Sequence, residues 1–129
     1  DAGNARIVLS VTIEGRLSTQ AIVDTGAPWC ILDPQLAQYL GVSAAGGHAC
    51  GRPLSIRGIS YPGRLHQMSI GLRNEGEGDD LEVPATVFVP TMRSGEVWLH
   101  PSFLGHTGLL DRIRFAVDPA ENAFYFGPL

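Results

Sequence analysis

Glycine and proline interrupt this chain at short intervals. Its 129 residues include 16 Gly and 9 Pro. Glycine weakens the interior of a helix or strand, and proline removes a backbone donor, so long uninterrupted elements are disfavoured. The composition favours many short strands joined by tight turns over a helix bundle. Since the length suits one compact core, we expect a single domain over residues 1–129.

The clearest strand signal lies near the start of the chain. Apolar residues alternate with other residues from Ile7 to Ile13, as in a strand with one buried face. A turn at residues 14–16 leads into a second predicted strand, Leu17 to Val23. This hairpin delivers the chain to Asp24.

The rest of the sequence extends this β pattern. An acidic cap, a proline at the first helical position and a closing glycine predict one short helix from Asp33 to Leu40. A second short helical segment is predicted over residues 106–111, an irregular connection over 43–53, and a solvated acidic loop over 74–82. Further strands are predicted at residues 54–59 and 64–72, around a tip containing Gly58, Pro62 and Gly63, and at 83–89, 113–117 and 123–126. With about eight strands, the prediction is a small all-β domain.

Composition excludes several classes of function. An apolar content of 44% with 17% charged residues indicates a globular protein. Nine basic against thirteen acidic residues, without a basic run, argue against nucleic-acid binding. The chain has no stretch of about 18 to 20 apolar residues that would span a membrane. It begins at Asp1, which leaves an upstream leader or anchor open, so the compartment is unknown, with the cytoplasm favoured.

Cysteine and histidine give no metal signal. Cys30 and Cys50 can form at most one disulfide, and the four histidines are scattered along the chain. A zinc site needs three or four ligands in a recognisable spacing. We therefore predict no metal site and no cofactor. A serine or cysteine nucleophile is disfavoured too, because no G-x-S-x-G elbow is present.

The motif that carries chemistry follows the second predicted strand. Ile22 and Val23 run directly into Asp24-Thr25-Gly26-Ala27. A carboxylate at the end of a core strand, followed by a hydroxyl and a glycine, can be fixed in a tight turn by backbone N–H groups. On its own the triplet also fits an ordinary Asx turn. The context at both ends of the chain strengthens the catalytic interpretation.

Three segments in order resemble the single-domain retropepsin-like aspartic proteases, in particular their bacterial members. They are residues 21–27 around Asp24, the helix at 34–41, and the segment from Phe103 to Phe115. The resemblance implies a small closed β-barrel with one or two short helices that works as a homodimer. It implies no cofactor and a peptide or protein substrate.

The resemblance also assigns roles to residues of this sequence. Asp24 matches the catalytic acid, Thr25 the hydroxyl that hydrogen-bonds across the dimer, Gly26 the backbone that meets substrate, and Ala27 the retroviral type of loop. Phe103, Leu104 and Gly105 match the motif that crosses behind the aspartate. Flap candidates are Gly58, Ile59, Ser60, Tyr61 and Pro62. With one such aspartate per chain, two subunits must each supply one carboxylate, and the pair shares a proton.

Two positions depart from the family pattern. Where family members often carry an acidic residue after Asp-Thr-Gly-Ala and an arginine after the later glycine, this sequence has Pro28 and His106. The pair that can buttress the active-site loop is missing, and Trp29 is a candidate to replace it by packing. Two alternatives therefore stay open: a catalytically inactive dimerisation or peptide-binding module of the same fold, and an unrelated small β-barrel that binds an apolar ligand.

Overall fold

The computed structural model describes residues 6–43 and 45–129, and its central feature is a barrel. Strands β1 (Ile7–Ile13), β2 (Leu17–Val23), β9 (Ser102–Leu104), β3 (Cys30–Ile31), β8 (Leu81–Pro90) and β7 (Gly63–Leu72) follow one another as hydrogen-bonded neighbours. β7 also pairs with β1, Val11 lying opposite Leu72, and this pairing closes the ring. The two-residue strand β4 (His48–Ala49) adds to the edge of β7. The all-β prediction is confirmed.

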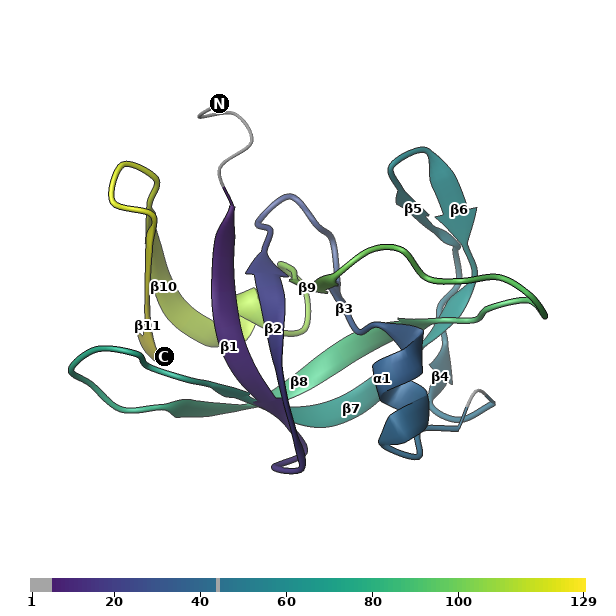
Figure 1. The fold of residues 1–129 in the computed structure, drawn as a ribbon, viewed down its shortest axis with the longest axis horizontal. Helices are drawn as coiled ribbons and strands as arrows, with labels where there is room; N and C mark the ends of the chain where they lie inside the picture. Colours follow the sequence, from purple (N-terminus) through teal and green to yellow (C-terminus); the bar gives the residue numbers. More distant parts are fainter. Residues whose placement is uncertain (1–5, 44) are drawn as a thin grey trace.

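Two hairpins stand outside the barrel, at opposite ends of the molecule in Figure 1. One consists of β5 (Leu54–Ile56) and β6 (Ile59–Tyr61), and the other of β10 (Ile113–Asp118) and β11 (Ala123–Pro128). Each forms a separate two-stranded sheet. The loop that follows β2 lies between them (Figure 1).

Helix α1 (Pro34–Tyr39) begins and ends where local signals predict. Asp33 is its N-cap, because the Asp33 carboxylate accepts a hydrogen bond of 2.8 Å from the N–H of Gln35. The chain leaves the helix through Gly41, whose φ of +80° suits glycine. A short 3₁₀ helix, η2 (Leu110–Arg112), overlaps the end of the second predicted helical segment, residues 106–111, and extends one residue beyond it.

The predicted strand over residues 54–59 is wrong in its bounds. Arg57 and Gly58 have φ values of +51° and +82° and form a two-residue turn, with Ile56 paired to Ile59. The positive φ values end β5 at Ile56, so the hairpin tip is Arg57-Gly58. Of the predicted tip residues, Gly58 lies there, whereas Pro62 and Gly63 lie after β6. Three strands of two or three residues, β3, β4 and β9, also went unpredicted, because they depend on partners distant in the sequence.

The buried apolar residues form two clusters. One fills the barrel, with Leu72, Ala85 and Val87 fully buried. The second lies beneath the β5–β6 hairpin and consists of Ile31, Leu54, Ile56, Tyr61, Phe88, Trp98 and Phe103. The second cluster therefore anchors the hairpin to the wall of the barrel beside the loop after β2.

Candidate active site

The loop after β2 holds Asp24 in a tight turn. The Asp24 carboxylate accepts a hydrogen bond of 3.0 Å from the N–H of Gly26, and the Asp24 carbonyl accepts one of 3.1 Å from the N–H of Ala27. Asp24 is half-buried, whereas Thr25 and Gly26 are exposed. The carboxylate is thus fixed by its own loop and still faces accessible space.

A segment about 80 residues further along the chain braces this loop from behind. β9 runs parallel to β2, and the carbonyl of Leu104 accepts a hydrogen bond of 3.0 Å from the N–H of Asp24. The N–H of His106 then donates to the carbonyl of Ala27 at 2.8 Å. The structure therefore brings the Phe103-Leu104-Gly105 motif directly behind the predicted catalytic loop.

Backbone contacts occupy the place where the sequence lacks an acidic residue and an arginine. The carbonyl of Pro28 accepts a hydrogen bond of 3.0 Å from the N–H of Thr107, and Trp29 forms a β-bridge with Thr107. The Trp29 side chain is partly buried against the second apolar cluster. Backbone hydrogen bonds thus tie the two segments together without a side-chain ion pair.

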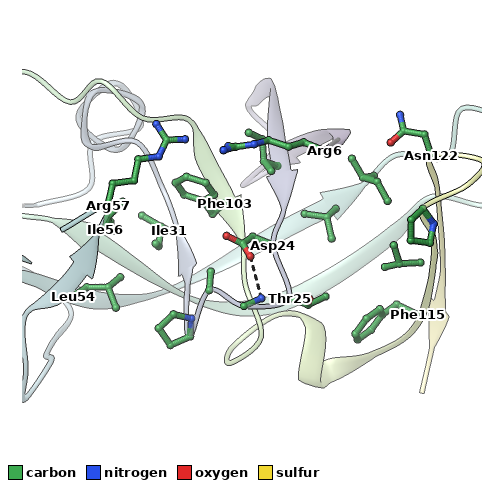
Figure 2. Close-up of a pocket in the computed structure, with 18 of the residues that line it drawn as sticks. Arg6, Asp24, Thr25, Ile31, Leu54, Ile56, Arg57, Phe103, Phe115 and Asn122 are labelled. Atoms are coloured by element: carbon green, nitrogen blue, oxygen red, sulfur yellow. Dashed lines mark hydrogen bonds between the residues drawn. The ribbon is translucent and has the colours of Figure 1, made fainter. Parts of the chain in front are cut away.

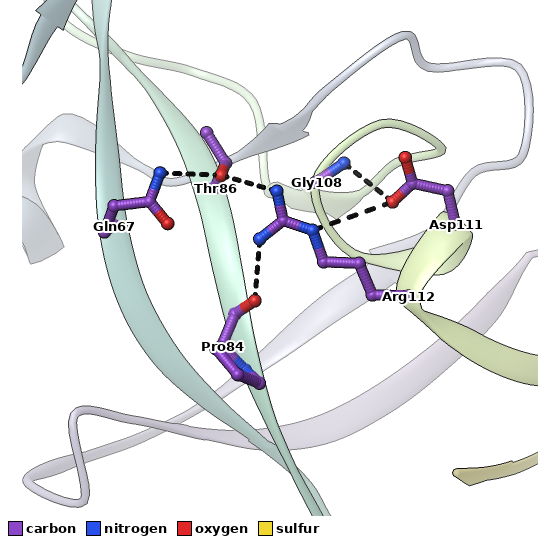
Figure 3. A network of polar contacts seen from close by, with 6 residues as sticks. All are labelled: Gln67, Pro84, Thr86, Gly108, Asp111 and Arg112. Carbon is purple, nitrogen blue, oxygen red and sulfur yellow. Dashed lines mark hydrogen bonds and ion pairs between the residues drawn. The ribbon is translucent and has the colours of Figure 1, made fainter. Parts of the chain in front are cut away.

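A polar network fastens the chain after this motif to the barrel, as Figure 3 shows. The guanidinium of Arg112 donates to the carbonyl of Pro84 at 2.7 Å and to the hydroxyl of Thr86 at 2.9 Å. Gln67 donates to the same hydroxyl at 2.9 Å, and Asp111 accepts a hydrogen bond of 3.0 Å from the N–H of Gly108. The Asp111 carboxylate therefore stabilises the turn at Gly108, which precedes η2 and β10.

Asp24 lies in a cleft of about 1170 Å³. This volume exceeds that of a typical small-molecule pocket, about 300 to 1000 Å³, and leaves room for a polymeric ligand. Figure 2 shows Asp24 between residues of the β5–β6 hairpin on one side and residues of the β10–β11 hairpin on the other. The lining residues are Arg6, Ile7, Ile22, Val23, Asp24, Thr25, Gly26, Ala27, Pro28, Ile31, Leu54, Ser55, Ile56, Arg57, Phe103, Phe115, Ala116, Val117, Pro119, Ala120 and Asn122.

The cleft brings together only some of the predicted site residues. Residues 24–27 and Phe103 line it, while Leu104 and Gly105 lie behind the loop. Of the β5–β6 hairpin, the residues that line it are 54–57, and none of the flap candidates 58–62 is among them. The sequence signal that could have pointed to β5 as part of the cleft wall is the alternation of apolar Leu54 and Ile56 shortly before Gly58.

An aromatic cluster packs under the β5–β6 hairpin. The rings of Tyr61 and His100 lie edge-on to Trp98, with centroids 5.1 and 4.8 Å from it. Trp98 Nε1 and His100 Nδ1 are buried and have no hydrogen-bond partner in residues 6–43 and 45–129. Desolvation, followed by the positive charge of Arg57, lowers the pKa of His100. Ring packing therefore holds the cluster, and the Trp98 side chain is buried within it.

Cys30 does not provide a nucleophile. It is buried, and desolvation raises the pKa of its thiol to about 12. The reactive form of cysteine is the thiolate, which this environment disfavours. Within the part of the chain that the structure describes, no group of three or more His, Cys, Asp or Glu side chains could hold a metal ion.

Among the described residues no helix is both long and apolar enough to cross a bilayer.

Comparisons with known proteins agree with this geometry. The model of the aspartyl protease family matches residues 9–100. A solved structure of a retropepsin-like aspartic protease from Rickettsia conorii is similar over 96% of this chain and 86% of that chain, with a TM-score of 0.62 and 20% sequence identity. No curated protein sequence gives a significant match. The chain belongs to the aspartyl protease family and has a retropepsin-like fold.

Proposed function

We propose that residues 1–129 act as one retropepsin-like domain and form an aspartic endopeptidase whose active site is shared by two copies of the chain. The observation that carries the proposal is the position of Asp24, half-buried in a large cleft and fixed by the N–H of Gly26. Among the described residues that line this cleft, Asp24 is the only carboxylic acid. One chain thus supplies half of an aspartyl pair.

Peptide hydrolysis by this route needs two carboxyl groups with different protonation. The ionised Asp24 accepts a proton from a water molecule as the water oxygen attacks the scissile carbonyl carbon. The protonated Asp24 of the second copy donates a hydrogen bond to the oxygen that becomes negative. The tetrahedral intermediate then collapses and the C–N bond breaks. The departing amine takes up the proton that the first Asp24 accepted from water, which returns that carboxyl group to its ionised form. Two close carboxyl groups favour this shared state, because both cannot carry charge together.

The loop residues support this arrangement in the dimer. Thr25 is exposed beside Asp24, where its hydroxyl is free to hydrogen-bond with the second loop. Gly26 exposes backbone at the cleft, where substrate main chain would lie. Ala27 is buried, and its carbonyl accepts a hydrogen bond from the N–H of His106. Thr25 would thus connect the two subunits, whereas Ala27 stabilises the loop within one subunit.

The C-terminal hairpin offers a surface for the second copy. Among residues 6–43 and 45–129 of one chain, β10 and β11 pair only with each other, and Phe115 and Val117 are 36% and 39% exposed. The hairpin packs on the barrel core through Phe124 and Phe126. An open strand edge tends to pair with another chain. A two-fold partner would cover Phe115 and Val117 and complete the cleft.

The β5–β6 hairpin is the proposed flap. It places Leu54 and Ile56 on the cleft, and the Arg57-Gly58 turn forms its tip. The flap candidates Gly58, Ile59, Ser60, Tyr61 and Pro62 then form the tip, the returning strand and its exit. The flap would close over the bound peptide and exclude water from the reacting atoms.

One observation favours a second candidate function. Pro28 and His106 replace the charged pair common in the family, which is consistent with a peptide-binding module that has lost catalysis. Such a module would dimerise and bind peptides without cleaving them.

Sedimentation analysis combined with a peptide-library digest separates these functions. The wild-type chain should dimerise and cleave peptides, with activity that rises with dimer concentration and is blocked by a statine-type inhibitor. Asp24→Asn should abolish cleavage, whereas Asp79→Asn, in the exposed acidic loop, should leave it intact. Cleavage that survives Asp24→Asn would refute the assignment. Dimers that bind peptides and leave them whole would support the inactive module.

A further inference from the structure

The cleft carries positive charge in a protein whose net charge is negative. The chain has a formal charge of −4, yet the ionisable side chains among the described lining residues are Arg6, Asp24 and Arg57. Figure 2 shows the guanidinium groups of Arg6 and Arg57 reaching from opposite sides above Asp24 and Phe103. In the proposed dimer, four arginines would face an aspartyl pair that holds one proton. The cleft would therefore attract anionic groups.

Arg57 occupies a backbone position that is unfavourable for arginine. With φ values of +51° at Arg57 and +82° at Gly58, the two-residue loop has the signature of a type I′ turn, where Asn, Asp or Gly is preferred at the first position. A side chain with a Cβ is strained in this region, and such strain clusters at functional sites. The turn itself thus gives no reason for an arginine at its first position.

The guanidinium of Arg57 has no hydrogen-bond acceptor or carboxylate partner among the described residues. Across residues 6–43 and 45–129, the Arg57 guanidinium forms neither an ion pair nor a side-chain hydrogen bond. By contrast, Arg64 and Arg112 both donate hydrogen bonds to backbone carbonyls of the barrel or its loops. Arg57 therefore retains its donors for a ligand in the cleft.

The surroundings of Arg57 define the rest of the ligand. Leu54 and Ile56 lie on β5, which ends immediately before Arg57. With Ile31 and Phe103 they give the neighbouring cleft wall an apolar surface. Guanidinium groups bind carboxylates with directional, charge-assisted hydrogen bonds. A peptide with an apolar segment next to an acidic side chain would match this wall.

We propose that Arg57 is a specificity-determining residue that selects peptides with an acidic side chain beside an apolar segment. This inference rests on the proposed peptidase function. Because a two-fold dimer carries one Arg57 on each side of its axis, the preference for Asp or Glu should appear at equivalent distances on both sides of the scissile bond.

The test uses the full chain and peptides with blocked ends. Acetylated and amidated peptides with an apolar core carry Glu or the isosteric Gln at each flanking position in turn, so the side chain is the only carboxylate that varies. Wild type should cleave the best Glu peptide with a kcat/KM about three- to tenfold above its Gln counterpart, and this ratio should shrink at about 1 M salt. A parallel set with free C-termini distinguishes side-chain recognition from recognition of a terminal carboxylate.

Three variants isolate the charge of Arg57. Arg57→Asn removes the charge and leaves a residue that suits the turn, so loss of the Glu preference cannot come from a misfolded tip. Arg57→Lys should retain part of the preference, and Arg52→Gln, at an exposed position outside the cleft lining, should retain all of it. Equal cleavage of Glu and Gln peptides by wild type would overturn the proposal, as would an unchanged ratio in Arg57→Asn or a preference confined to free C-termini.

Failure of the inference differs from failure of the proposed function. If cleavage requires Asp24 but Glu and Gln peptides are cleaved equally well, the peptidase function is supported and the role of Arg57 is refuted. If wild type cleaves no peptide, fluorescence anisotropy measures its binding of the same Glu and Gln peptides instead. A preference for Glu peptides that is lost in Arg57→Asn would support the role of Arg57 in peptide selection. Equal binding of both peptides, or no binding, would overturn it.

Discussion

Gly105 lies against the backbone carbonyl of Trp29 with no room for a side chain. A Cβ at Gly105 would overlap the Trp29 carbonyl oxygen and would also lie 2.8 Å from the carbonyl oxygen of Ala27. Both obstacles are backbone atoms of the loop that holds Asp24, so a rotamer change cannot relieve them. Because Gly105 has no side chain, the segment that follows β9 can pass directly behind this loop, with the two backbones in contact.

Gly105→Ala should therefore destabilise the fold and displace the Asp24 loop. We expect the free energy of unfolding to fall by about 2 to 3 kcal/mol, because overpacking next to backbone forces the main chain to move. Urea titration measures the change. Gly51→Ala is the control, since a Cβ there meets no atom within 4 Å and should leave stability nearly unchanged. A stability equal to wild type in Gly105→Ala would show that the crossing is looser than described.

Arg112 is expected to stabilise the connection between η2 and the barrel. Arg112→Ala removes the donors to the Pro84 carbonyl and the Thr86 hydroxyl. The loss should be about 1 to 2 kcal/mol, because the contacts are partly exposed and water can replace some of them. Arg93→Ala, at an exposed position on the loop after β8, should change stability by less than about 0.5 kcal/mol. Equal effects of the two substitutions in thermal unfolding would contradict a specific role for Arg112.

Stability should fall as the pH drops below the ordinary pKa of histidine, about 6.5. Desolvation lowers the pKa of His66 and of His100, with further contributions from Arg64 and then His48 at His66, and from Arg57 at His100. Between each lowered pKa and 6.5 the unfolded chain binds a proton that the folded chain does not. The free energy of unfolding therefore rises with pH through this window and levels off above it.

Urea midpoints between about pH 5 and about pH 8 test this dependence. His100→Phe keeps an aromatic ring beside Trp98 but cannot be protonated, so it should flatten the curve. His106→Gln, at an exposed position, should leave the curve as in wild type. A wild-type stability that increases toward low pH would show that these imidazoles gain protons on folding.

Local signals made much of this protein predictable. The helix from Pro34 to Tyr39 follows from an aspartate cap, a proline and a terminating glycine, all within nine residues of sequence. The strand β1 follows from alternation, because one of its faces is buried. The strand β2 was predicted as the segment that returns after the turn at residues 14–16. In the Asp24 loop, the carboxylate accepts a hydrogen bond from the N–H of Gly26, two residues further on. This contact lies within the Asp-Thr-Gly triplet and needs no distant residue.

Other features needed the tertiary structure. β3 and β9 contain only two or three residues, and they exist because distant strands supply their hydrogen bonds. The cleft wall formed by residues 54–57 was missed because a positive φ at Arg57 is unusual for arginine. The predicted tip therefore included Gly58 but extended to Pro62 and Gly63.

By itself the sequence determined the all-β class and the short helix at Pro34, because both follow from patterns within a few positions. It also indicated Asp24 as the residue on which the chemistry is proposed to depend, through its motif and the resemblance of two further segments. Only the tertiary structure decided what surrounds that residue. The N–H of Asp24 is satisfied by Leu104, and its cleft joins hairpins from the middle and the end of the chain. Such contacts depend on closure of the barrel, which pairs strands far apart in sequence, and no local pattern specifies that pairing.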